Sequence, residues 1–214
     1  MKLLAICGSA RENGNTAILL QKAIEGAKSA GVETELVNLF DLEYRGCIGC
    51  CTCKLKSNKN IGHCAVNDGL KPLLENIEKS DILVLGSPVY YGNLSGQMRS
   101  FTDRLLFQYN SYGDTTSVPK PKQIKTALIA TMNASEEIFT TRGMKNTFEN
   151  FAAFMARTFG SCELLTLSST IQFDDYSKYA YELPDKEEKS KRKEKIAPKD
   201  LQRAFDLVVK LAKP

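Results

Sequence analysis

Residues 2–16 read KLLAICGSARENGNT, a short apolar run followed by a polar turn that contains two glycines. The run at 2–7 shows no apolar–polar alternation, which is typical of a strand buried on both faces of a sheet. From Thr16 to Gly31 the apolar residues recur at helical spacing, so a helix follows the turn directly. This strand–turn–helix order predicts the first unit of a parallel sheet with a helix packed on its face.

Four further strands are predicted along the chain, each separated from the next by a helical segment; the first of them alternates apolar and polar residues. They cover residues 33–39, 81–86, 125–132 and 162–167. Helical patterns begin after Asp68, which we expect to act as an N-cap, and recur at 95–107, around 148–155 and at 201–211. Parallel strands need a covering helix at each crossover, so the sequence predicts an α/β fold in three layers.

The composition restricts the class of protein. The chain has 214 residues, 43% hydrophobic and 25% charged, which excludes a disordered chain, a collagen-like fibre and a coiled coil. No apolar run approaches the roughly 18 residues of a membrane span, and the N-terminal run is too short for a signal peptide. A net charge of +4 is small for a nucleic-acid binder. We therefore expect one cytoplasmic domain over 1–214, without a membrane or nucleic-acid partner.

The turn after the first strand has the chemistry of an anion site. Its neutral donors and one cation face the start of a helix, whose free N–H groups attract anions. These side chains are Ser9, Arg11, Asn13, Asn15 and Thr16. The turn lacks the Gly-Lys-Ser/Thr of a Walker loop and the Gly-x-Gly-x-x-Gly of a dinucleotide site. An ordinary glycine turn with a Thr or Asn cap is the alternative.

Two segments together resemble a known family. GSARENGNT at 8–16 is similar to the phosphate loop of the NAD(P)H-dependent FMN reductase family, in the flavodoxin-like superfamily. SPVYYGNLSGQMRSFTDR at 87–104 resembles that family's Pro-x-Tyr-aromatic-Gly segment and the helix that follows it. The resemblance extends over most of residues 1–165. It implies a flavodoxin-like three-layer sandwich with a five-stranded parallel sheet in the order 2-1-3-4-5.

The resemblance also implies a cofactor and an activity. Ser9, Arg11, Asn15 and Thr16 would hold the phosphate of FMN, with Asn13 in the same turn. The segment along the isoalloxazine would be Pro88, Val89, Tyr90, Tyr91, Gly92 and Asn93, and Asn133 would close a third side. The implied protein is an FMN-dependent NAD(P)H oxidoreductase of the flavin or quinone reductase type, and a homodimer or homotetramer. A hydride would pass from the nicotinamide to flavin N5, and electrons would go on to a small-molecule or protein acceptor. Because the cofactor performs this chemistry, we expect no catalytic acid–base pair, and the single histidine, His63, suits a surface residue better.

Five of the seven cysteines fall in a loop at 47–64 that we interpret as an insertion. Cys47, Cys50, Cys53 and Cys64 form C-x2-C-x2-C-x10-C, which resembles the motif of the iron–sulfur flavoproteins, relatives that carry a [4Fe–4S] cluster beside the flavin. The last gap is longer than that family's usual spacing, and Cys51 is an extra thiol. Three interpretations stay open: a bound cluster, free or disulfide-bonded thiols in an ordinary flavin reductase, and structural zinc.

Two other functions are compatible with the same sequence features. An iron–sulfur flavoprotein would pass electrons through the cluster to a partner. A flavodoxin-like carrier would be non-enzymatic, although such carriers are usually acidic and this chain has a pI of 8.6.

Residues 170–198, which we call the arm, carry three tyrosines and a charge run at 186–195. We expect a solvated loop or exposed helix there. The alternatives are an arm that packs on a neighbouring subunit through the tyrosines, or a lid over a ligand.

Overall fold

The computed structural model describes residues 1–57, 59, 61–113, 118–191 and 194–213. Its sheet has the order β2-β1-β3-β5-β6, all parallel, and the two-residue β4 pairs antiparallel with β3. Counted among the parallel strands alone, this is the predicted order 2-1-3-4-5. The strands are β1 (Lys2–Cys7), β2 (Glu33–Asn38), β3 (Ile82–Tyr90), β4 (Asn93–Leu94), β5 (Ile124–Thr131) and β6 (Gly160–Leu167).

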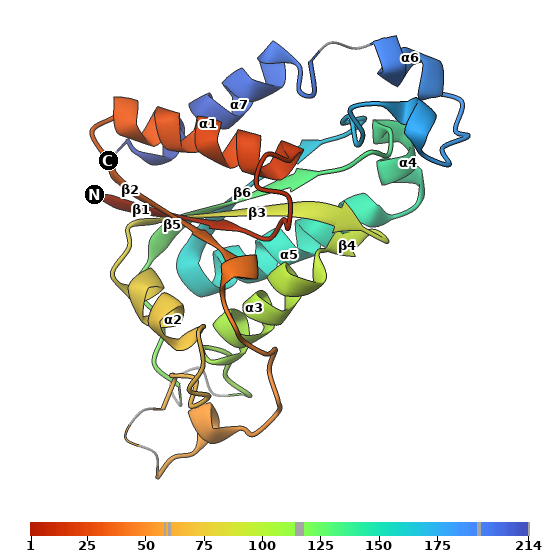
Figure 1. Cartoon of the computed structure of the whole chain (residues 1–214). Coiled ribbons are helices and arrows are strands. Elements are labelled where there is room, and N and C mark those ends of the chain that lie inside the picture. Colours follow the sequence, from red (N-terminus) through yellow and green to blue (C-terminus); the bar gives the residue numbers. More distant parts are fainter. Residues whose placement is uncertain (58, 60, 114–117, 192–193, 214) are drawn as a thin grey trace.

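Helices cover both faces of the sheet, which gives the three predicted layers (Figure 1). On one face lie α1 (Asn15–Ser29) and α7 (Pro198–Leu211). On the other lie α2 (Lys71–Glu78), α3 (Gly96–Phe107) and α5 (Met144–Phe159). The short helices α4 (Glu136–Thr141) and α6 (Lys186–Lys191) lie beyond the carboxyl ends of the strands (Figure 1).

The absence of alternation in β1 follows from these two covered faces. Leu4 and Ile6 belong to the apolar core beneath α2, α3 and α5, whereas Leu3 and Ala5 belong to the core beneath α1 and α7. All four side chains are fully buried. A strand that feeds two cores needs apolar residues at every position, which explains the continuous run in the sequence.

Two local predictions were wrong. The segment after residue 86 does not leave the sheet at once, because β3 continues to Tyr90 and forms a hairpin with β4. Tyr91 and Gly92 turn this hairpin with φ of 49° and 77°, a left-handed pair that tyrosine rarely adopts. Asp68 is not the N-cap of α2, which begins at Lys71. Its carboxylate accepts the Leu70 N–H within the preceding turn instead.

The arm is packed against its own chain. Of the three tyrosines that one alternative assigned to a neighbouring subunit, Tyr176 and Tyr181 are buried in a small cluster with Ile171, against which Phe173 packs, whereas Tyr179 is 50% exposed. Tyr179 stacks on Phe173 with ring centroids 4.0 Å apart. The first six residues of the charge run form α6, and residues 192–193 of that run lie outside the described residues.

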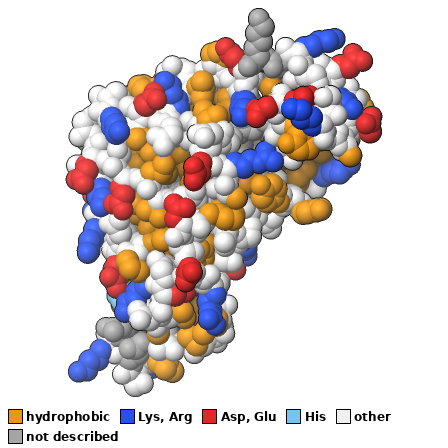
Figure 2. Space-filling model, in the orientation of Figure 1, with side chains coloured by type: hydrophobic (Ala, Val, Ile, Leu, Met, Phe, Trp, Pro, Cys, Tyr) orange, Lys and Arg blue, Asp and Glu red, His pale blue; other side chains and the backbone are white. Residues whose placement is uncertain are grey.

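In the described part of the chain, no helix is both long and apolar enough to cross a membrane. Figure 2 shows lysine and arginine interspersed with aspartate and glutamate over the face it draws.

Candidate functional site

The two segments that resemble the family meet at Gly8, where β1 ends. The Gly8 N–H donates to the Gly86 carbonyl of β3 at 2.8 Å, and the Gly8 carbonyl accepts from the Ser95 hydroxyl at 2.7 Å. Ser95 is also the N-cap of α3. A Cβ atom at Gly8 would lie 2.8 Å from the Cβ of Met98, so only glycine allows this approach. The predicted phosphate turn and the start of α3 are therefore one structural unit.

The start of α1 has the predicted features of an anion site. Gly14 occupies its N-cap position, and no side chain there accepts from the first-turn N–H groups. The helix has 15 residues, long enough for its aligned dipoles to favour an anion at this end.

Ser9 and Thr16 support this turn from inside. The buried Ser9 hydroxyl accepts from the Arg11 N–H at 3.2 Å. The Thr16 hydroxyl lies 2.8 Å from that of Thr131, at the end of β5. Both side chains therefore position the turn, and Asn13 is exposed on it.

Arg11 and Asn15 connect the turn to the arm. Arg11 Nη1 donates to the Gln172 carbonyl at 2.7 Å, and Asn15 Nδ2 donates to the Ile171 carbonyl at 2.8 Å. Asn15 Oδ1 is buried without a hydrogen-bond donor. Because a phosphate dianion has no hydrogen to donate, this oxygen suits a hydroxyl group better than a phosphate.

Asn133 lies under the arm. Its carbonyl accepts from Lys189 Nζ at 2.9 Å, and its side-chain amide donates to the Tyr181 hydroxyl at 3.1 Å. Lys189 is 2% exposed and forms an ion pair with Asp185 at 2.7 Å. A lysine within the charge run is therefore a buried tether for the arm, which the charge pattern alone gave no means to detect.

The hairpin after β3 carries the predicted isoalloxazine segment. Pro88 and Val89 are half-buried and Asn93 is exposed, while the Tyr90 and Tyr91 rings face solvent. A Cβ at Gly92 would lie 3.0 Å from Cγ of Met144, so the turn packs closely against the start of α5. The hairpin presents aromatic surface beside a glycine backbone, which suits a flat ring.

The five clustered cysteines line one small pocket, which we call the cysteine pocket. Its other lining residues include Arg104 and Gln108 at the end of α3, and its sulfur-bearing residues are Cys47, Cys50, Cys51, Cys53 and Cys64. All five are free thiols; Cys47, Cys50 and Cys51 are exposed, whereas Cys53 is buried. Hydrogen bonds from the side chain and backbone of Thr52 lower the pKa of Cys50, whereas burial raises the pKa of Cys53.

The spacing of these thiols distinguishes kinds of metal centre. Among the described residues, no three His, Cys, Asp or Glu side chains lie close enough to hold one metal ion. A zinc ion needs four ligands around one point, whereas a four-iron cluster takes one thiolate at each iron and so spreads its ligands. The pocket has a volume of about 20 Å³, room for about one water molecule. A cluster would therefore fit only after the exposed cysteines move outward.

A buried ion pair closes the inner side of the cysteine pocket. Arg104 Nη1 donates to Asp68 at 2.7 and 2.9 Å and to the Arg45 carbonyl at 3.1 Å. Burial opposes ionisation of Asp68, but hydrogen bonds from Arg104 and from backbone N–H groups outweigh it and hold the pKa of the carboxyl below its usual value. The sequence placed Arg104 at the end of the helix that resembles the family's. No local pattern predicted its ion pair with Asp68.

His63, Cys7 and Cys162 lie outside the cysteine pocket and the predicted FMN segments. His63 is exposed, with Nδ1 3.1 Å from a carboxylate oxygen of Glu78. Cys7 is buried and Cys162 half-buried, and burial raises the pKa of both thiols.

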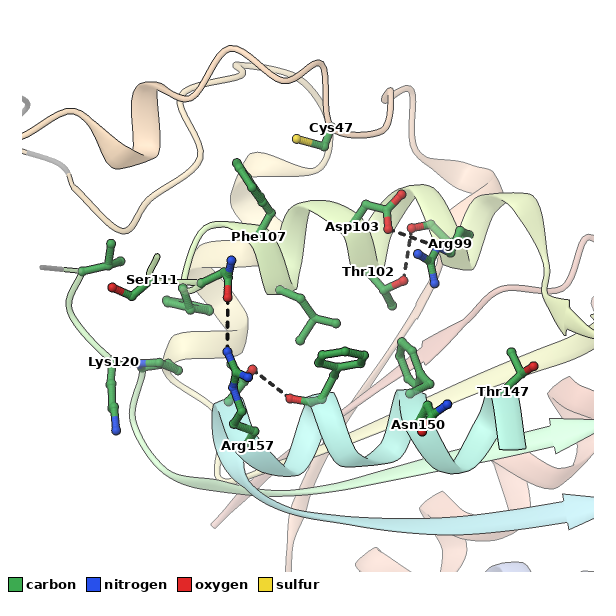
Figure 3. Close-up of a pocket in the computed structure, with 18 of the residues that line it drawn as sticks. Cys47, Arg99, Thr102, Asp103, Phe107, Ser111, Lys120, Thr147, Asn150 and Arg157 are labelled. Carbon is green, nitrogen blue, oxygen red and sulfur yellow. Dashed lines mark hydrogen bonds and ion pairs between the residues drawn. The ribbon is translucent and has the colours of Figure 1, made fainter. Parts of the chain in front are cut away.

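A second pocket, of about 1110 Å³, lies between α3 and α5. Figure 3 shows Arg99, Thr102 and Asp103 on α3 facing Thr147 and Asn150 on α5, with Cys47 above them. Aromatic rings, three cations and one carboxylate line it: Phe107, Tyr109, Phe151, Phe154, Arg99, Lys120, Arg157 and Asp103. Cys47 and Phe107 also line the cysteine pocket, so the two pockets adjoin.

The family model described as NADPH-dependent FMN reductase matches residues 1–159. An iron–sulfur flavoprotein of Methanocaldococcus jannaschii is 38% identical over 104 residues, which cover 49% of this chain and 51% of that protein. An FMN-dependent NADPH-azoreductase of Staphylococcus aureus is 30% identical over 114 residues, covering 51% and 54%. The chain spans about half the length of these curated relatives.

Solved structures agree on the fold. An NAD(P)H:quinone oxidoreductase from Methanothermobacter marburgensis aligns with a TM-score of 0.68 at 14% identity, over 100% of this chain and 98% of that one. A flavodoxin from the domain Archaea aligns with a TM-score of 0.50 at 15% identity, over 99% and 96%. The predicted flavodoxin-like fold is confirmed.

Proposed function

Because the chain belongs to the NADPH-dependent FMN reductase family, we propose that it is an FMN-dependent NAD(P)H oxidoreductase. The observation that carries the proposal is the junction at Gly8, where the uncapped start of α1, strand β3 and the start of α3 converge. FMN, when bound, would take a hydride from the nicotinamide and pass electrons to a second acceptor. The protein would bind the cofactor, orient it and limit its access to water.

The residues present suit FMN. The first-turn N–H groups of α1 and the free donors of Arg11 would bind the phosphate, since Arg11 uses only Nη1 on the arm. The unpaired Asn15 Oδ1 would accept from a hydroxyl of the ribityl chain. The hairpin backbone around Gly92, with Tyr90 beside it, would lie along the isoalloxazine.

An iron–sulfur centre is the second part of the proposal. We propose that Cys47, Cys50, Cys53 and Cys64 hold a [4Fe–4S] cluster, because all four line one pocket and the lowered pKa of Cys50 favours the thiolate that metals require. Cys51, whose φ is 53°, would be the spare thiol.

The pocket between α3 and α5 suits the second substrate. Its volume and aromatic lining are those of a small-molecule site, and its excess of cations favours an anionic guest. We propose that a small-molecule acceptor or a nicotinamide nucleotide binds there.

Location and assembly are further proposals. Seven free thiols, five of them clustered, suit the reducing conditions of the cytoplasm. Assembly as a homodimer or homotetramer rests on the family resemblance alone.

An absorption spectrum of anaerobically purified protein tests the proposal most directly, because flavin and cluster bands report separately. We expect both, together with oxidation of NADH or NADPH without an added reductase. A Cys50→Ser variant should lose iron and sulfide while it keeps flavin, and Cys162→Ser is the matched control. Colourless protein that does not take up FMN contradicts the reductase assignment. Bound FMN without NAD(P)H oxidation would favour a non-enzymatic carrier.

A further inference from the structure

Two buried hydrogen-bond donors without partners lie beside the same pocket. Among the described residues, Arg104 Nε and Gln108 Nε2 have no hydrogen-bond partner of normal geometry, and both side chains line the cysteine pocket. Arg104 is 1% exposed and Gln108 is 2% exposed. A buried donor left unpaired costs about 1–3 kcal/mol, and more when it is charged. The two groups therefore call for an acceptor within the pocket.

The other atoms of both side chains are already engaged. Arg104 Nη1 binds Asp68, and Nη2 donates to the Val66 carbonyl at 3.1 Å. Gln108 Oε1 accepts from the Cys64 N–H at 3.0 Å. Neither side chain can rotate toward another acceptor without breaking these bonds. Because the residues are four apart at the end of α3, their side chains lie on the same side of the helix, and both line the pocket.

The pocket offers sulfur as the acceptor. Its walls carry five thiols, and thiolate or sulfide sulfur is negatively charged in an iron–sulfur centre. The Arg104 guanidinium stays protonated in proteins, and its ion pair with Asp68 at 2.7 Å fixes it beside these thiols. A fixed cation and a fixed amide thus face an anionic sulfur site.

We propose that Arg104 and Gln108 are positioning residues for the iron–sulfur cluster, whose sulfur atoms accept hydrogen bonds from Arg104 Nε–H and Gln108 Nε2–H. The inference rests on the cluster part of the proposed function. Hydrogen bonds to sulfur stabilise the more negative, reduced cluster, so the two donors raise its midpoint potential. The end of α3 thereby sets how readily the cluster takes an electron.

Two variants of the holoprotein test this inference. Gln108→Met keeps the length of the side chain and removes both the Nε2–H donor and the oxygen that accepts from the Cys64 N–H. Arg104→Lys keeps the charge opposite Asp68 and removes Nε–H. After anaerobic reconstitution with iron and sulfide, we expect each variant to lower the equilibrium constant for one-electron reduction about tenfold, about 59 mV in midpoint potential. EPR-monitored redox titration measures the shift, and the exposed Gln202→Met on α7 is the matched control.

The outcomes separate this inference from the proposed function. The inference is overturned if both variants keep the wild-type iron content and the wild-type midpoint potential. It is also overturned if Gln108→Met loses part of its iron while the cluster that it retains has the wild-type midpoint potential. Gln108→Met decides alone if Arg104→Lys does not fold. Wild-type protein that binds FMN and oxidises NAD(P)H but takes up no iron overturns the inference and leaves the reductase function standing. A cluster with shifted potentials but no NAD(P)H oxidation supports the inference and contradicts the reductase function.

Discussion

At the scale of single residues, the charged groups of this protein divide by burial. Arg104 and Asp68 form a pair whose side chains are 0% and 17% exposed, whereas Arg99 and Asp103, on the same helix as Arg104, are 54% and 45% exposed. Removal of one partner from a buried pair leaves the other charge uncompensated, while a solvated pair contributes little. The two pairs should therefore respond very differently to the same substitution.

We expect Asp68→Asn to lower the free energy of unfolding by about 3–5 kcal/mol at pH 7, and Asp103→Asn to lower it by less than about 1 kcal/mol. Urea unfolding measures both. Equal effects would show that burial of the Arg104 pair carries no extra stabilisation.

The depressed pKa of Asp68 gives this pair a pH dependence. Its stabilisation is fully present above the pKa of about 3.9 that the carboxyl has in the unfolded chain, and it is lost as pH falls through the lower folded value. Unfolding free energies measured from pH 6 to pH 2.5 should fall more steeply for the wild type than for Asp68→Asn. Parallel curves would contradict the assignment.

Arg11 is the residue on which phosphate binding depends most in the proposed FMN site. Loss of a charge-assisted hydrogen bond costs about 1.5–3 kcal/mol, so Arg11→Ala should weaken FMN binding about 10- to 100-fold. Flavin fluorescence titration measures the dissociation constant, and Arg203→Ala on α7 is the control. Arg11 also holds the arm through the Gln172 carbonyl. The loss of FMN affinity in Arg11→Ala should therefore be larger than the loss in a variant that releases the arm at another contact.

At the scale of elements, α1 and α7 approach each other closely at one glycine. A Cβ at Gly26 would lie 2.5 Å from the backbone oxygen of Phe205. Alanine improves helix propensity by about 1 kcal/mol, but a clash with backbone in a packed contact costs about 1–3 kcal/mol. The clash should win, because backbone atoms cannot turn aside as a side chain can.

Gly26→Ala should therefore lower the thermal midpoint of unfolding, whereas Gly96→Ala at the start of α3, where a Cβ would meet nothing within 4 Å, should not. Differential scanning calorimetry compares the two. Stabilisation by Gly26→Ala would mean that the helices separate at little cost.

Elements differ in how far the sequence predicted them. Strands β1, β3 and β5 were predictable because each carries an apolar run that serves two cores, as Leu3 and Leu4 do in adjacent positions, whereas the edge strand β2 has no buried residue. The hairpin at Tyr91 was missed, since its left-handed tyrosine contradicts residue preference. The pairing of Arg104 with Asp68 joins positions 36 residues apart, and no local spacing encodes it. The motifs of the candidate site could be predicted from the sequence. The contacts that hold those motifs in place, such as the Arg104–Asp68 pair, could not.

At the scale of the whole molecule, the arm ties the carboxyl edge of the sheet together. It contacts the β1–α1 turn through Ile171 and Gln172, and the loop after β5 through Tyr181 and Lys189. These contacts are few and local, so the arm should open without global unfolding.

Lys189→Met should accelerate hydrogen exchange across residues 170–191 while the global unfolding midpoint changes little. Lys186→Met, which removes an exposed pair with Glu182 from the same helix, should leave exchange in the arm unchanged. Mass spectrometry of peptic fragments resolves the segment. Unchanged exchange in Lys189→Met would show that the buried lysine does not tether the arm.

The position of α7 has a consequence for biosynthesis. This helix packs along α1 and completes the core that α1 shares with the sheet, although more than 160 residues separate the two in the chain. At about 5–20 residues per second, a ribosome needs roughly 10–35 s to make the chain between them. Throughout that interval the side of α1 that packs on α7, which includes Gly26, stays uncovered in the nascent chain. Chaperones that bind exposed apolar helices would therefore meet this protein at its first helix, before its last one emerges.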